Sequence, residues 1–368
     1  MARKPEGKLR KGWTTGACAT AATKAAFIAL HTKEFPDPVT ITLPKGQTPS
    51  FALTKEQLED GFASASVVKD AGDDPDVTHL AVIQSTVRIG RPGTGIVFKA
   101  GSGVGMVTKE GLPIPPGEPA INPVPRQMMQ QVIEEVANYH QVSKDVEIEI
   151  SIENGAALAE KTWNPRLGIL GGLSVLGTTG VVIPYSCSSW IHSIHRGIDV
   201  ARAAVYPHVA AATGSTSEKM VQDLYGLDET ALLDMGDFAG GLLKYLRKNP
   251  VPRISIAGGF AKIVKLAQGN MDLHSGRSQV DFSWLSDQAA LLGGSDRLCS
   301  QINEANTAKQ VLDICSLEGI PIARFIANKA RNEALAMLNN DKIELEILLI
   351  DRQGALIGRS DFQVSDYD

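Results

Sequence analysis

Apolar and polar positions in the first 160 residues follow a helical period in two segments and a strand period in several others. TTGACATAATKAAFIAL, which starts at Thr14, is an amphipathic, alanine-rich segment led by a candidate N-cap, and it predicts a helix ending near Leu30. The amphipathic segment 125–140 predicts a second helix, with Pro125 in its first turn. Strands of a mixed sheet are predicted at 39–46, 50–57, 63–69, 79–91, 93–100 and 145–155, the first two as a hairpin.

The pattern changes after about Asn164, where short apolar runs lead into glycine-rich turns and then into helices. This order occurs three times, in 167–180, 208–226 and 253–269. Such alternation favours parallel βα units, in which the carboxyl ends of the strands and the N-termini of the helices gather at one edge of a sheet. The segment 285–338 is predicted to be mainly helical, and 342–351 a closing strand that either sheet can accept.

A chain of 368 residues exceeds what one hydrophobic core usually holds, so two domains are expected. The change of pattern places their boundary near Glu160. The predicted fold class is α+β followed by α/β. An N-terminal mixed-sheet α+β domain with glycine- and proline-rich active-site loops covers residues 1–160, and a C-terminal Rossmann-like βα domain covers residues 161–368.

Composition narrows the class of protein further. Hydrophobic residues make up 43% and charged residues 21% of the chain, which is typical of soluble globular proteins. The net charge of -5 argues against a general nucleic-acid binder. The four cysteines lie far apart with no CxxC pair, so no metal site or disulfide framework is expected and a reducing compartment is indicated. The basic segment 1–13 precedes no apolar signal core, and no run reaches membrane-spanning length, so a cytoplasmic protein without a membrane partner is expected.

The run from Gly101 to Pro125 combines a glycine-rich half with a proline-rich half. Glycines let backbone amides approach an anion or cofactor, although tight turns between strands explain the same spacing equally well. Prolines stiffen the second half and hold Glu118, Asn122 and Arg126 on an extended path, which suits either a binding site or a wall between domains.

An acidic loop, VVKDAGDDPDVTH from Val67, carries the candidates for acid–base chemistry. Its carboxylates and His79 are able to bind a cation, orient a sulfonium or supply a base, while turn and capping roles are the alternative. His192 and His195 lie three residues apart without a third ligand, which favours packing roles. Cys18 is interpreted as a buried small side chain.

Several motifs together resemble the CbiD family. They occur in the same order from about residue 10 to about residue 275, and they are GWTTGACATAATKAA, VVKDAGDDPDVTH, GVGMVTKEGLPIPPGEPAINPVPR, NPRLGILGGLSVLGTTG, ATGSTSE and GNMDLHS. The chain departs from the family pattern at Leu80, where a glycine often follows the histidine, and at Cys187–Trp190, where a shorter turn is usual. These departures affect the detail of the pocket more than the type of reaction.

The resemblance implies an S-adenosylmethionine-dependent enzyme of anaerobic-type cobalamin biosynthesis. It implies methylation of ring carbon 1 of cobalt-precorrin-5B to give cobalt-precorrin-6A, with cobalt present only as part of an anionic tetrapyrrole substrate. Displacement at a sulfonium depends on alignment and desolvation more than on a covalent residue, so the lack of a catalytic triad is expected. A homo-oligomer is compatible with the sequence.

The site residues follow from this reaction. Asp70, Asp73 and His79 are the candidates for adjusting protonation near carbon 1. The cosubstrate is placed at the strand ends of the βα domain, at Thr178, Thr179, Gly180, Gly214, Ser215 and Thr216. Carboxylates of the tetrapyrrole are assigned to arginines, helix N-termini and glycine amides. The candidate substrate-binding residues are Thr14, Thr15, Gly101, Gly103, Gly105, Glu118, Asn122, Arg126, Arg166 and His274.

Two other functions remain open at this point. AGSGVGMVTK is compatible with the phosphate loop of a small-molecule kinase, although it lacks a lysine–serine pair and metal ligands. A non-catalytic tetrapyrrole carrier would use the same cleft without a cosubstrate.

Overall fold

The computed structural model describes residues 7–365, so the start of the basic N-terminal segment, residues 1–6, lies outside the described residues. The chain divides between Cys187 and Ser188 into two units. This division lies well after the boundary expected near Glu160, because two short strands beyond that point pair within the first unit. β10 (Ile169–Leu170) pairs with β8 (Met106–Val107), and β11 (Val181–Val182) pairs with β1 (Gly12–Trp13).

A five-stranded sheet forms the centre of the N-terminal unit, with strand order β4-β5-β6-β9-β7. Its first four strands in this order pair antiparallel, and β7 pairs parallel with β9, so the predicted mixed sheet is confirmed. The predicted hairpin is also confirmed, since β2 (Val39–Thr40) pairs antiparallel with β3 (Ser50–Phe51). The sheet strands are β4 (Lys55–Glu59), β5 (Phe62–Val68), β6 (Val82–Ile89), β7 (Ile96–Ala100) and β9 (Val146–Ile152).

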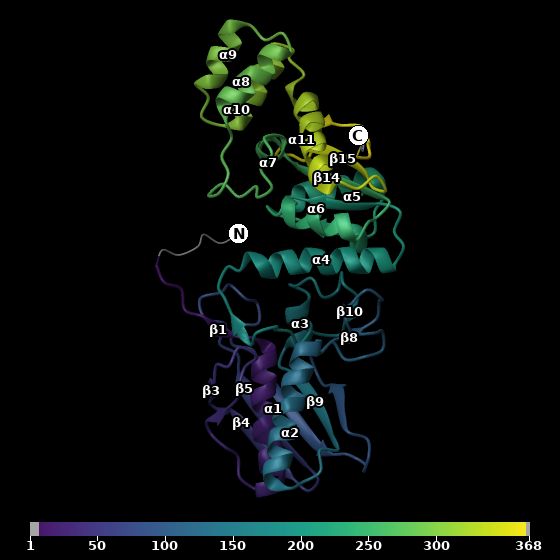
Figure 1. Ribbon diagram of the computed structural model, residues 1–368. Coiled ribbons are helices and arrows are strands. Elements are labelled where there is room, and N and C mark those ends of the chain that lie inside the picture. Colours follow the sequence, from purple (N-terminus) through teal and green to yellow (C-terminus); the bar gives the residue numbers. More distant parts are fainter. Residues whose placement is uncertain (1–6, 366–368) are drawn as a thin grey trace. The chain divides into compact units, whose positions relative to one another are not determined.

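Two long helices lie side by side against this sheet, as Figure 1 shows. They are α1 (Thr15–Thr32) and α2 (Pro123–His140), while α3 (Gly155–Ala159) is a short helix after β9. Fourteen of the 18 residues of α1 are buried, so this helix is enclosed on most of its circumference rather than on one face as its amphipathic interpretation implied. Its alanines allow the close approach, and the Thr23 and Ser85 hydroxyls bond at 2.8 Å across the contact.

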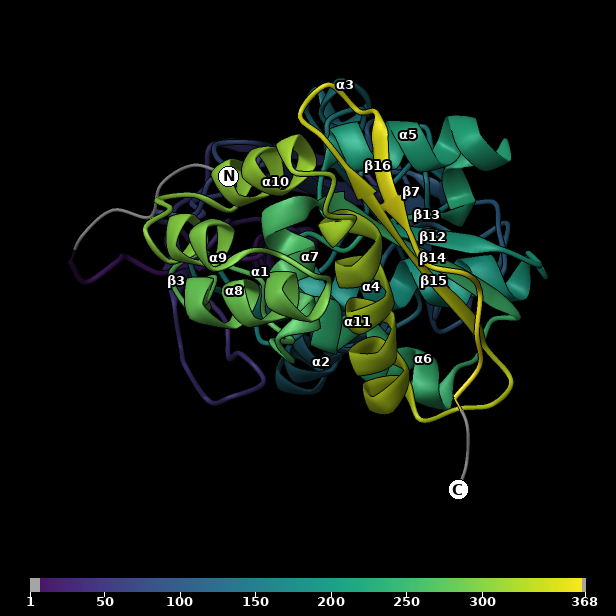
Figure 2. The same ribbon diagram turned by 90° about the horizontal axis from the view of Figure 1, so that it is seen from above.

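The C-terminal unit contains a second five-stranded sheet, with order β13-β12-β14-β15-β16. Its first four strands in this order are parallel, and the edge strand β16 is antiparallel to β15. The strand predicted at 342–351 therefore joins this sheet. The strands, whose arrangement can be followed in Figure 2, are β12 (Val209–Ala212), β13 (Leu232–Asp234), β14 (Arg253–Gly259), β15 (Glu344–Ile350) and β16 (Leu356–Arg359).

Two of the three predicted βα units are present. β12 leads into α5, and β14 leads into α7, as the apolar runs and glycine turns of these segments predict. The third prediction, for 167–180, is wrong, because that segment holds only the two residues of β10 and belongs to the N-terminal unit. Glycine-bounded apolar runs look alike in sequence whether or not a helix follows.

Helices account for most of the remaining C-terminal residues, in agreement with the prediction for 285–338. Helix α11 packs on α7, β15 and β16, and α8, α9 and α10 form a cluster that contacts α7 and α11 through α10 (Figure 1). Within residues 7–365 no helix is long and apolar enough to cross a membrane. The helices are α4 (Cys187–Ala203), α5 (Ser215–Tyr225), the 3-10 helix η1 (Glu229–Ala231), α6 (Ala239–Lys248), α7 (Phe260–Ala267), α8 (Phe282–Leu291), α9 (Asp296–Asn303), α10 (Ala308–Leu317) and α11 (Ile322–Leu338).

One glycine in the run after β7 is required by both its backbone angle and its surroundings. Gly103 has φ +77°, and a Cβ atom built on it would lie 2.1 Å from the carbonyl oxygen of Ile152. The Gly103 carbonyl also accepts a hydrogen bond from the Leu173 amide at 2.9 Å. The chain therefore passes backbone against backbone here, which only glycine permits.

We predict that Gly103→Ala lowers the free energy of unfolding by about 3 kcal/mol, since strain in a left-handed backbone adds to the steric clash. Gly117 is the matched control, because it has φ +88° and a Cβ atom added to it would meet no other atom within 4 Å. Gly117→Ala should cost only about 1 kcal/mol. Urea denaturation of both variants measures the difference, and equal losses would contradict the packing argument.

Candidate functional site

The loop between β5 and β6, residues 69–81, gathers most of the charged candidates of the N-terminal unit. Backbone hydrogen bonds close it at the base, from the Lys69 amide to the Ala81 carbonyl at 2.9 Å and from the Leu80 amide to the Lys69 carbonyl at 2.8 Å. Leu80 has φ +65°, the left-handed region in which glycine is favoured, which explains why glycine suits this position. The loop is thus a closed turn rather than an open connection.

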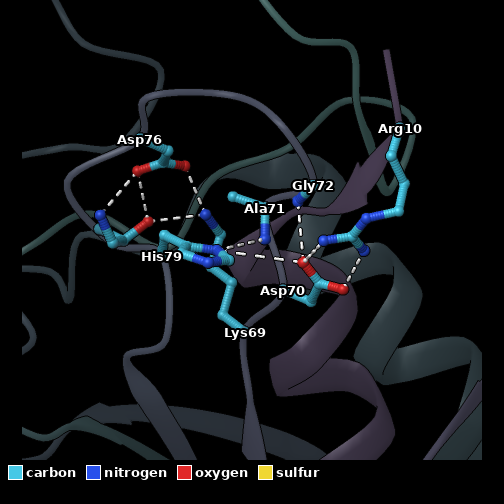
Figure 3. Close-up of polar contacts among 8 residues, drawn as sticks. Arg10, Lys69, Asp70, Ala71, Gly72, Asp76 and His79 are labelled. Atoms are coloured by element: carbon cyan, nitrogen blue, oxygen red, sulfur yellow. Dashed lines mark hydrogen bonds and ion pairs between the residues drawn. The ribbon is translucent and has the colours of Figure 1, made fainter. Parts of the chain in front are cut away.

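Arg10 binds the two acids that the sequence singles out. Its guanidinium forms an ion pair with Asp70, including a hydrogen bond from Nη2 to Oδ1 of 3.0 Å, as Figure 3 shows. The Arg10 amide donates to Asp73 Oδ2 at 2.6 Å, and the Asp73 amide returns a bond to the Arg10 carbonyl at 3.0 Å. The hydrogen bond from Arg10 holds the pKa of Asp70 below its usual value, against a smaller opposing effect of burial. Asp70 is therefore a carboxylate rather than a proton donor near neutral pH.

His79 completes this group. Its Nδ1 accepts a hydrogen bond from the Ala71 amide at 3.1 Å and lies 4.0 Å from Asp70 Oδ1 (Figure 3). A neutral imidazole that accepts at Nδ1 carries its proton on Nε2, so Nε2 is the atom available to donate. The structure thus brings the three proposed acid–base residues together in one loop.

A buried ion pair in the same loop was missed by the sequence interpretation. The Lys69 side chain is 2% exposed, and its ammonium group pairs with Asp76 and donates to Thr78 Oγ1 at 2.7 Å. Burial works to raise the pKa of Asp76, but the Lys69 charge and the hydrogen bonds from Lys69 and Thr78 together hold it below its usual value. A lysine after a β-branched run resembles a surface residue, so no sequence signal marks it.

A cavity of about 190 Å³ adjoins this ion pair, and we call it the Lys69 cavity. Thr14 and Thr15, two of the predicted substrate-binding residues, line it together with Lys69 and Asp76. Thr14 is the N-cap of α1, and its hydroxyl accepts a hydrogen bond from the Ala17 amide at 3.2 Å. Further polar lining residues are Thr78, Thr162, Asn164 and Ser174.

A second cavity, of about 520 Å³, lies beside β7, and we call it the Arg126 cavity. Arg126 and Glu118 both line it and form an ion pair of 3.1 Å. The guanidinium is fixed further by a bond from Nε to the Ile121 carbonyl at 2.8 Å and by its position 5.3 Å from the Phe98 ring centre. Asn122 is the N-cap of α2, with no hydrogen bond from its side chain to the helix.

The glycines at 101, 103 and 105 pack against protein rather than facing open space. A Cβ atom on Gly101 would lie 2.0 Å from Ser151 Oγ, and one on Gly105 would lie 2.5 Å from Ile169 Cγ2. The amides of these two glycines donate to the carbonyls of Ile150 and Leu173. Tight turns with close backbone contact, the structural alternative stated above, account for these positions.

Two other candidate residues are not among those that line either cavity. The Arg166 guanidinium lies 5.2 Å from the ring centre of Trp163 in the N-terminal unit. His274 lies in a loop of the C-terminal unit, where its Nδ1 accepts from the Gly276 amide at 3.0 Å. His195, interpreted as a packing residue, stacks on Tyr245 with 3.9 Å between ring centres. Cys18 is fully buried, and burial raises the pKa of its thiol to about 12, so it is not an activated nucleophile.

The placement of Thr178, Thr179 and Gly180 at the edge of the C-terminal sheet is corrected by the structure. These residues belong to the N-terminal unit, where the Gly180 carbonyl accepts from the Thr14 amide at 3.0 Å. The other predicted cosubstrate residues, Gly214, Ser215 and Thr216, do lie after β12 at the start of α5. The six residues therefore do not share one sheet edge.

Gly214 leaves open space at the start of α5. It is the N-cap of this helix and makes no side-chain cap bond, and among the described residues no other atom lies within 4 Å of a Cβ position built on it. Gly259, the N-cap of α7 after the neighbouring strand β14, has the same two properties. Glycine at the N-cap leaves the first helix amides at the carboxyl ends of these parallel strands unobstructed by an N-cap side chain.

Comparison with known proteins agrees with the motif pattern. The family model CbiD matches residues 2–184, and the model "CbiD, C-terminal domain" matches residues 272–361. A protein of Paramagnetospirillum magneticum named cobalt-precorrin-5B C(1)-methyltransferase is 59% identical over 96% of this chain and 98% of its own length. One of Brucella anthropi with the same name is 59% identical over 96% of both chains.

A solved structure, the cobalamin biosynthesis protein CbiD of Archaeoglobus fulgidus, aligns over 85% of this chain and 86% of its own, with 24% identity and a TM-score of 0.40. The extent and identity of the full-length sequence matches establish the relationship independently of this alignment. The chain belongs to the CbiD family.

Proposed function

We propose that this protein methylates ring carbon 1 of cobalt-precorrin-5B with S-adenosylmethionine as methyl donor, giving cobalt-precorrin-6A in cobalamin biosynthesis. The observation that carries the proposal is 59% identity, over 96% of this chain, to relatives named cobalt-precorrin-5B C(1)-methyltransferase. Neither relative's name points to phosphoryl transfer or to carriage of a tetrapyrrole, so the kinase and carrier alternatives have no support.

The 69–81 loop is our candidate for the acid–base part of this reaction. Methyl transfer moves positive charge from the sulfonium to the tetrapyrrole, whose ring then loses a proton. Asp70 and Asp73 are carboxylates next to Arg10, so they suit attraction of a cation or acceptance of a proton more than donation. His79, with Nε2 available as donor, is suited to donating a hydrogen bond or a proton to the periphery of the tetrapyrrole ring.

The Arg126 cavity is our candidate for part of the substrate periphery. The acetate and propionate groups of the tetrapyrrole are anionic, and a protein with a net charge of -5 must bind them with local cations. Arg126 is already oriented by a carbonyl and an aromatic ring, so little side-chain entropy is lost when it binds a carboxylate. Arg166 is the second proposed carboxylate-binding arginine.

The cosubstrate site is proposed at the start of α5, in a C-terminal unit that we interpret as Rossmann-like. Strand β12 has β13 on one side and β14 on the other, so the direction of the chain across the sheet reverses beside β12. Ligands of such sheets bind at the carboxyl ends of the strands where this reversal occurs. Gly214, Ser215 and Thr216 stand at that point.

The cytoplasmic location and a homo-oligomeric state stay predictions.

Incubating the purified protein with cobalt-precorrin-5B and methyl-labelled S-adenosylmethionine should add one labelled methyl group at ring carbon 1, as mass spectrometry and NMR of the product would show. ATP should neither bind nor be consumed. An unmodified tetrapyrrole that nevertheless binds tightly would favour the carrier, and ATP turnover would favour the kinase.

Arg126→Ala should weaken binding of cobalt-precorrin-5B roughly 10- to 100-fold, the effect of losing one charged hydrogen-bond donor, and should leave S-adenosylmethionine affinity unchanged. Arg88→Ala is the control. Arg88 lies on β6 of the sheet that contains β7 and forms an ion pair of 3.3 Å with Glu149, but it does not line the Arg126 cavity. Calorimetric titration measures both affinities. An unchanged affinity for the tetrapyrrole would remove Arg126 from the proposed site.

Gly214→Val should abolish measurable binding of S-adenosylmethionine, because a branched side chain would fill the open approach to the first amides of α5. The same variant should bind cobalt-precorrin-5B normally, which serves as the internal control for folding. Normal calorimetric binding of the cosubstrate would refute this placement.

A further inference from the structure

Three buried side chains around the Lys69 cavity have hydrogen-bond donors that no residue within 7–365 accepts. Lys69 is 1% exposed, and its ammonium has three N–H groups, of which Asp76 and Thr78 accept two. Thr15 is 3% exposed, and neither its hydroxyl nor its amide has an acceptor within that range. Asn164 is 8% exposed and uses its side-chain carbonyl, but not its amide nitrogen, in a bond of 3.2 Å from the Ser174 hydroxyl.

These unmet donors point to a ligand. Each of these donors is reached from the cavity, since none of them is among the enclosed side-chain atoms that lack a partner in the described residues. A group bound in the cavity is therefore able to accept from all three. Each of the three offers an N–H or O–H group, so the matching ligand group is an acceptor. An ionised carboxylate is acceptor-only, with about four lone-pair sites on two oxygens, which suits several converging donors.

The electrostatics of the cavity also favour an anion. Asp76 offsets the charge of Lys69, but Thr15 is the first residue of α1, an 18-residue helix with no acidic residue in its first turn. The N-terminus of a helix carries a partial positive charge. The Gly16 and Ala17 amides of α1 already donate to the Leu176 carbonyl and the Thr14 hydroxyl, so the Thr15 amide is the donor left for an anion.

The size of the cavity limits what enters it. Its volume of about 190 Å³ lies below the ~300 Å³ at which pockets begin to hold a whole drug-sized ligand. Val77, Leu173 and Leu176 provide apolar lining next to the donors. A short alkyl chain that ends in a carboxylate matches both the volume and this lining.

We propose that the Lys69 cavity is a binding site for one alkyl carboxylate, held by Lys69, Thr15 and Asn164. This inference rests on the proposed function, which supplies two molecules that bear such a group. They are the tetrapyrrole, through its acetate or propionate side chains, and S-adenosylmethionine, through its amino-acid end.

The test removes both charges of the ion pair together, in the double variant Lys69→Met with Asp76→Asn, so that no buried charge is left unpaired. The matched control is Lys55→Met with Glu153→Gln, which neutralises an exposed ion pair of the same unit. Calorimetric titration of each full-length protein with cobalt-precorrin-5B and with S-adenosylmethionine gives the affinities. The cavity variant should lose roughly 10- to 100-fold affinity for the molecule whose carboxylate it binds, and the control should lose none.

A second variant tests the same site in case the double variant does not fold. Thr15→Val keeps the shape of the side chain and the ion pair, and should lose about tenfold affinity for the same molecule. A loss seen with cobalt-precorrin-5B but not with its esterified form identifies the tetrapyrrole side chain. A loss seen with S-adenosylmethionine but not with its decarboxylated form identifies the methyl donor.

Unchanged affinity for both molecules in folded Thr15→Val and in the double variant would overturn the carboxylate site, while methylation by the wild-type protein would still stand. A wild-type protein that binds neither molecule would instead count against the proposed function, so the two failures are distinguishable.

Discussion

The burial of α1 on most of its circumference is the constraint on which the N-terminal unit depends. Because its side chains are small, this helix packs closely against β5 and β6 on one side and against α2 on another. Polar residues tolerate that burial because the Thr20 and Thr23 hydroxyls bond to carbonyls one turn earlier, at 2.8 Å in each case. The fixed helix carries Thr15 at its start to the Lys69 cavity, whose lysine directly follows β5.

Charge pairing determines the conformation of the 69–81 loop. Four aspartates within seven positions would repel one another, yet each has its own donor. Arg10 binds the first two, the Tyr185 amide donates to Asp74 at 2.7 Å, and Lys69 neutralises Asp76. The loop is thereby ordered by the protein's own cations and amides, and the cation-binding role allowed by its composition is not needed to explain its shape.

Local signals predicted most of the elements correctly, because propensity and periodicity are local properties. The start of α1 at an N-capping Thr14 and the place of Pro125 in the first turn of α2 are examples. The same reasoning gave a wrong prediction for segment 167–180, because the pairing of this segment with β8 depends on residues some sixty positions away. The buried position of Lys69 was not predicted for a similar reason, because the burial of a charged side chain depends on partners that only the folded loop supplies. The glycines near 101 were open to two interpretations in the sequence, and only the neighbouring backbone separates them.

The pairing of β1 with β11 has a consequence for biosynthesis of the chain. Gly12 lies opposite Val182, so one of the first strands to leave the ribosome finds its partner only after about 170 further residues have been made. Arg10, just before β1, likewise waits for residues 70–73 before its bonds to the acidic loop can form. The N-terminal unit thus completes its native pairing only when about half of the 368 residues have been made, and a chain interrupted before residue 182 would expose an unpaired β1 and an incomplete enzyme.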